Sequence, residues 1–126
     1  MNDEITDRLK DLNIEDFIWV IYLGIIFLSY YSNHLERNFF LTNNPESKEK
    51  YQKIIILIFA ILIVVYLYFL KDAWDDLNNL KPTDSPKKKK LITLSFIGSL
   101  LITISGAIFL FIAIADEDLN VELAFN

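Results

Sequence analysis

The sequence predicts an all-α membrane protein in which three transmembrane helices form an up-down-up bundle, with short amphipathic helical extensions on the cytoplasmic side. Three stretches of the 126-residue chain contain no charged residue, namely Phe17–Tyr31, Ile54–Leu70 and Leu91–Ala115. Uncharged apolar runs of about twenty residues are long enough to cross the hydrocarbon core as helices. Charged residues make up 23% of the chain but lie between these runs, whereas a soluble domain would intersperse them. We therefore expect residues 1–126 to form a single three-span membrane domain.

The first span must be longer than its uncharged core. Residues 17–31 would form a helix of roughly 22 Å, which is short of a hydrocarbon core about 30 Å thick. To cross the membrane, the helix must continue through the polar residues 32–38 to the apolar residues 39–41. The first span is therefore predicted at residues 17–41.

The segment that precedes this span, residues 1–16, is acidic and amphipathic. Its apolar side chains recur at helical spacing at Ile5, Leu9 and Leu12. This pattern predicts a cytoplasmic helical segment that packs on the other extension or lies on the lipid headgroups. Because secretory signal peptides begin with a basic region, the acidic start favours retention of the first span.

The second helix has a recognisable start and end. The motif Asn44-Pro45-Glu46 predicts a helix that begins with an asparagine cap, a proline in its first position and an acid that complements the helix dipole. Tyr51 and Trp74 are interfacial anchors, so the second span is predicted at residues 51–74. Apolar residues continue at helical spacing beyond the span, and the helix is expected to run to about residue 81, directly before Pro82.

The third span is predicted at residues 91–115, and its small residues fall on one narrow stripe. Small side chains let helix backbones approach closely, which drives helix association in lipid. The stripe predicts packing against another helix of the same chain, or alternatively self-association. It is formed by Ser95, Ser99, Gly106 and Ala113.

The tail, residues 116–126, begins with three acidic residues that are expected to mark the helix end, because the dipole disfavours negative charge there. Apolar and polar residues then alternate, with the apolar ones at Leu119, Val121, Leu123 and Phe125. This period of two is typical of a short strand that could pair with a partner's sheet edge. A frayed terminus is the alternative.

The distribution of basic residues predicts the orientation. Eight of the twelve lysines and arginines lie in the N-terminal segment and the second loop. The positive-inside rule places both in the cytoplasm, and therefore the C-terminus outside a plasma membrane. The run Lys87, Lys88, Lys89 and Lys90 is expected to contact anionic headgroups, each lysine contributing about 1 kcal/mol. Nucleic acid would need a larger basic surface and is not expected as a partner.

A stripe of polar side chains on the first helix is the candidate functional site. At 100° per residue, Tyr22, Ser29, Asn33 and Glu36 lie within about 60° of one another, with Arg37 beside them and His34 and Asn38 pointing away. Polar groups in a span usually face protein or water. The stripe therefore predicts hydrogen bonds to neighbouring helices and headgroups. The alternative is a water-lined path or small-ligand site that includes Glu36.

Residue types argue against enzyme chemistry. The chain has no cysteine and a single histidine, so thiolate chemistry and a histidine metal site are not expected. No pair of acidic or histidine residues lies within the uncharged runs to transfer protons, and neither enzymatic activity nor a cofactor is predicted.

Three functions are compatible with these features. The first is a non-enzymatic accessory, scaffold or immunity-type protein that forms a homo-oligomer or binds a second membrane protein. The second is an oligomeric channel or pore lined by the polar stripe. The third is a holin-like lysis protein, which resembles the chain in size and number of spans, although such holins usually end in a basic cytoplasmic tail. The richness in Ile, Asn and Lys indicates an AT-rich, bacterial genome.

Overall fold

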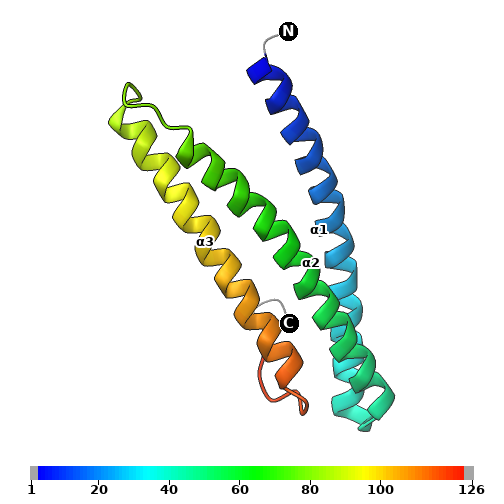
Figure 1. The fold of residues 1–126 in the computed structure, drawn as a ribbon. Coiled ribbons are helices and arrows are strands. Elements are labelled where there is room, and N and C mark those ends of the chain that lie inside the picture. The colour runs from blue at the N-terminus through cyan, green and yellow to red at the C-terminus, as the bar shows by residue number, and fades with distance from the viewer. Residues whose placement is uncertain (1–2, 124–126) are drawn as a thin grey trace. The chain divides into compact units, whose positions relative to one another are not determined.

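Three long helices make up the computed structural model, which describes residues 3–123 (Figure 1). They are α1 (Asp3–Thr42), α2 (Pro45–Asn78) and α3 (Pro86–Ala115), and no strand occurs among the described residues. All three are long and apolar enough to cross a membrane, which confirms the all-α, three-span class. The chain divides into two compact units, residues 1–54 and 55–126, so that α2 contributes to both.

Helix α1 continues through the polar residues 32–38, as the length of the hydrocarbon core requires. Its 40 residues extend over about 60 Å, well beyond a bilayer of about 40–45 Å including headgroups. The acidic segment that precedes the span is part of this helix, and Ile5, Leu9 and Leu12 on it are exposed. The predicted helical extension is therefore present and is continuous with the span, while its contact with the other extension or with the headgroups stays a prediction.

A two-residue turn joins α1 to α2. Asn43 has a positive φ of 54°, which asparagine tolerates better than most residues, and its N–H donates to the carbonyl of Phe39 at 2.7 Å. The side-chain oxygen of Asn44 then accepts from the N–H of Glu46 at 3.0 Å, so the predicted cap is present. The chain thus reverses direction with its backbone groups satisfied.

Helix α2 ends at Asn78, three residues before the predicted end. The carboxylate of Asp84 accepts a hydrogen bond from the N–H of Lys81 at 2.7 Å, which draws that residue out of the helix. Pro82 also disfavours helical backbone at the residue before it. The predicted extension beyond the span is therefore present, but it ends about three residues earlier than expected because local apolar spacing does not report these two constraints.

The last part of α2 and α3 run antiparallel in the second unit. Ser85 caps α3 by accepting from the N–H of Lys88, and Pro86 takes the first turn. Figure 1 shows the two helices side by side and running in opposite directions. Aromatic pairs join them in reversed order along the chain, namely Phe59 with Phe109, at 5.7 Å between ring centroids, and Trp74 with Phe96, at 5.4 Å.

The tail after α3 forms a turn, not a strand, over its described residues. The two carboxylate oxygens of Asp116 accept from the N–H groups of Asn120 at 2.9 Å and Val121 at 2.8 Å. Leu119 adopts a positive φ of 55°, which breaks any extended run. The predicted alternation is therefore not a strand at Leu119–Leu123, while Phe125 lies outside the described residues.

Candidate functional site

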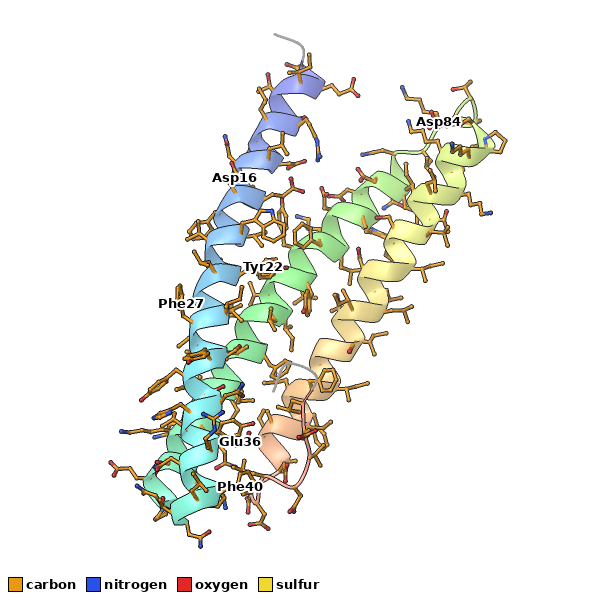
Figure 2. The ribbon with its side chains drawn as sticks, turned by 180° about the vertical axis from the view of Figure 1, so that it is seen from behind. Asp16, Tyr22, Phe27, Glu36, Phe40 and Asp84 are labelled. Atoms are coloured by element: carbon orange, nitrogen blue, oxygen red, sulfur yellow. The ribbon has the colours of Figure 1, made fainter. Side chains whose placement is uncertain are left out.

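The predicted polar stripe occupies one side of α1 without converging on a point. Tyr22, Ser29 and Glu36 are half-buried, whereas Asn33 and Arg37 are exposed. Fourteen residues separate the first of these from Glu36, which corresponds to about 21 Å along the helix. Figure 2 shows the two ends of the stripe, Tyr22 and Glu36, well separated on α1. The stripe is therefore a line of contacts and not a single pocket.

Two members of the stripe are held by neighbouring residues of α1. The Tyr22 ring packs edge-on against Trp19, with centroids 5.6 Å apart. The backbone carbonyl of Ser29 accepts a hydrogen bond from the hydroxyl of Ser32 at 2.8 Å. Ser32 has an exposed fraction of 0%, so this hydroxyl is fully removed from the surface. Its bond back to the helix satisfies it, as serine commonly does inside a helix.

A second polar group lies where α1 meets α2, and sequence reasoning missed it. The side-chain amide nitrogen of Asn38 donates to the hydroxyl of Ser47 at 2.6 Å. The backbone carbonyl of Asn38 accepts a hydrogen bond from the Thr42 hydroxyl at 2.7 Å. Asn38 lies off the predicted stripe, but its side chain forms a hydrogen bond across the turn. The cap at Asn44 was the available signal, since it starts α2 three residues before Ser47 and so places that hydroxyl in its first turn.

The same corner carries a cation–π contact. The ammonium of Lys48 lies 5.7 Å from the centroid of the Phe39 ring. Contacts of this kind contribute about 0.5–1 kcal/mol at exposed sites. Together with the bond between Asn38 and Ser47, the contact fixes the start of α2 to the end of α1.

The predicted small-residue stripe on α3 is divided by the structure. Gly106 and Ala113 are buried, Ser99 is half-buried and Ser95 is exposed. A Cβ added at Gly106 would lie 3.1 Å from two ring carbons of Tyr66 on α2, so only hydrogen fits without movement. The half-buried Thr103 on the same side, absent from the prediction, donates to the carbonyl of Ser99 at 2.7 Å.

The four lysines at the start of α3 also differ from one another. Lys88 forms an ion pair with Asp84 at 3.2 Å, and the ammonium of Lys89 donates to the carbonyl of Pro82 at 3.2 Å. Lys87 and Lys90 are exposed. The N–H of Lys81, and then the ammonium of Lys88, lower the pKa of Asp84 below its ordinary value.

The polar and charged features described above lie along the helices and at the turns that join them. No group of three histidine, aspartate or glutamate residues that could hold a metal occurs within residues 3–123. The features that do occur are a polar line on α1, a hydrogen-bonded corner, a close helix–helix seam and a basic turn. No family model, curated protein sequence or solved structure matches the chain, so the function has to be argued from these features.

Proposed function

We propose that this protein is a small polytopic membrane protein with a non-enzymatic accessory, scaffold or immunity-type role. In this proposal it recognises a second membrane protein, or another copy of itself, through the outward side of α1. The observation that carries the proposal is Asn33, which is exposed about two turns inside the predicted end of the span at residue 41. An amide in lipid is costly unless another polar group binds it.

The surroundings of Asn33 fit a protein partner. Ser32, its neighbour, is fully buried, so polar groups on the other side of α1 are already accommodated within the chain. Tyr30, three residues before Asn33 and so on the same side of α1, is exposed at 80%. Tyrosines and a few hydrogen-bonding groups are typical of the anchors that supply most of an interface's binding energy.

Photo-cross-linking from α1 tests the proposal. A photoreactive amino acid replaces Asn33, and in a matched control it replaces Phe27, which is also exposed and lies on a different side of α1 from Tyr22 (Figure 2). We expect a protein adduct from the Asn33 position and lipid adducts from the Phe27 position. Lipid adducts alone from both positions would contradict the proposal.

A channel is the second candidate, favoured by the three half-buried polar side chains that share one side of α1, Tyr22, Ser29 and Glu36. Purified protein in liposomes would then conduct ions, and Glu36→Gln would abolish the flux. An absence of flux, or flux that is unchanged by Ser29→Ala and Glu36→Gln, would exclude the channel and favour the accessory role.

The proposal includes a bacterial plasma membrane with the N-terminus in the cytoplasm and the C-terminus outside, supported by the lysines of the second loop. The chain has no cysteine, so single cysteines introduced at Thr83 and Glu117 give unambiguous labels. We expect an impermeant thiol reagent added to intact cells to label position 117 and not position 83. Labelling of position 83 and not of position 117 would indicate the opposite orientation.

A further inference from the structure

One side of α3 carries lysines at the start of the helix and, further along, exposed apolar side chains that are interrupted by a glycine. Taking 100° per residue, the members of this surface lie within about 100° of one another. All of them are exposed, and we call this set the outer face of α3. It consists of Lys87, Lys90, Leu91, Leu94, Gly98 and Leu101.

The lysines of the outer face differ from their neighbours in what they contact. Lys88 and Lys89 are engaged by Asp84 and Pro82 within the turn. The structure shows no hydrogen bond or ion pair to the side-chain ammonium group of Lys87 or Lys90 within residues 3–123. These two side chains are one helical turn apart, so their ammonium groups can reach the same anion.

Electrostatics at this end of α3 favour an added anion. The first five residues of α3 include four lysines and no acidic residue, although the positive end of the helix dipole disfavours cations there. Asp84 compensates one of these charges through Lys88. A phosphate near Lys87 and Lys90 would offset the remaining repulsion.

The depth of the lysines matches that of lipid headgroups. Trp74 and Phe96 form an aromatic pair between α2 and α3, and tryptophan is enriched at the headgroup level of membranes. Lys90 precedes Phe96 by six residues, or about 9 Å along the helix. This spacing places the lysine ammonium groups on the aqueous side of the aromatic pair, where lipid phosphates lie.

Gly98 opens a gap in the apolar part of the outer face. A Cβ added there would meet no heavy atom within 4 Å. Leu94 and Leu101 lie one turn on either side of it and are exposed. The gap lies about 12 Å along the helix from Lys90, a distance that a lipid bound at the lysines reaches with its acyl chain.

We propose that the outer face of α3 binds an anionic phospholipid. Lys87 and Lys90 hold its phosphate, and one acyl chain lies over Gly98 between Leu94 and Leu101. This inference is independent of the proposed partner on α1, because it concerns a different helix and a lipid ligand.

Native mass spectrometry of the full-length protein tests the headgroup part. Phosphatidylglycerol and phosphatidylcholine with identical acyl chains are titrated into the detergent-solubilised protein. We expect Lys87→Gln with Lys90→Gln to weaken phosphatidylglycerol binding by about thirtyfold, since each lysine near an anionic surface contributes roughly a factor of five. Phosphatidylcholine binding should not change. The matched control, Lys88→Gln with Lys89→Gln, should lose clearly less. Equal losses in the two double variants would overturn the assignment and indicate diffuse attraction.

Filling the gap tests the acyl-chain part. Gly98→Leu should reduce the binding of phosphatidylglycerol several-fold. Gly24→Leu on α1 is the matched control, because Gly24 also has no heavy atom within 4 Å of an added Cβ. Circular dichroism verifies that both variants keep the wild-type helix content. Unchanged binding by Gly98→Leu, or an equal loss in Gly24→Leu, would overturn this part of the proposal.

Discussion

The seam between α2 and α3 makes a sharp prediction about Gly106. A Cβ at this position would lie 3.1 Å from the Cδ2 and Cε2 atoms of Tyr66 and 3.5 Å from the Cγ1 atom of Ile63. Carbon atoms pack best at about 3.5–4.0 Å. Gly106→Ala therefore requires the Tyr66 ring to move by a few tenths of an ångström, while helix propensity improves by about 1 kcal/mol. We expect these effects to offset each other to within about 1 kcal/mol.

Gly106→Leu should be much more damaging, because three further carbons must enter space already filled by the Tyr66 ring. Overpacking of this kind costs about 1–3 kcal/mol, occasionally more. We expect a loss near the upper end of that range, about 3 kcal/mol, since the first carbon already lies too close. Gly98→Leu is the matched control, because its Cβ meets nothing within 4 Å. It should leave the free energy of unfolding unchanged or slightly higher.

Unfolding in mixed micelles measures the effect. Sodium dodecyl sulfate is titrated into the protein in a mild detergent, and the emission of Trp74 is followed in a Trp19→Phe background. Trp74 packs against Phe96 across the seam, so its emission reports separation of the two helices. If Gly106→Leu and Gly98→Leu unfold at the same detergent fraction as the parent, close packing at Gly106 does not hold the helices together.

Three further predictions concern the turns. Asn43→Val should lower the free energy of unfolding by about 1–2 kcal/mol, because a β-branched residue is strained at a φ of 54°, whereas Asn43→Gly should not, as chemical denaturation would show. Asp116→Ala removes the acceptor of two backbone N–H groups, so hydrogen exchange at residues 120 and 121 should accelerate severalfold, and unchanged protection would contradict the assigned bonds. The pKa of Asp84 is lowered, first by the Lys81 N–H. Its contribution to the order of the turn is therefore present above the ordinary aspartate pKa of about 3.9 and lost as the pH falls through the lower folded value. Carboxyl carbon chemical shifts that titrate at or above the ordinary value would refute this.

Much of the fold is predictable from the sequence because the relevant free energies are local. The cost of placing charge in lipid is set residue by residue, so three uncharged runs suffice to predict three spans. The start of α2 follows from Asn44 and Pro45, whose preferences act within one turn. The continuation of α1 past residue 31 follows from the thickness of the membrane alone.

Which side chains pack against one another could not be predicted from the sequence. Because α3 is apolar on all sides, no amphipathic pattern marks which side packs against α2, and the small-residue stripe could not separate the buried Gly106 from the exposed Ser95. Packing decides the rotation of the helix, and steric fit around Tyr66 decides which small residue is required. The bond between Asn38 and Ser47 likewise depends on the turn between α1 and α2, which brings the start of α2 next to the end of α1.

The sequence by itself determined that this chain forms three helices long and apolar enough to cross a membrane, since each segment's transfer into lipid is governed by its own composition. Only the tertiary structure decided which side chains are engaged within the chain and which are exposed. Lys88 and Lys89 are engaged by the turn while Lys87 and Lys90 are exposed, and Ser32 is buried while Asn33 is exposed. The reason is physical: neighbouring residues of a helix point about 100° apart, so each meets different surroundings, which are fixed by the fold of the turn before α3 and by the packing of the helices.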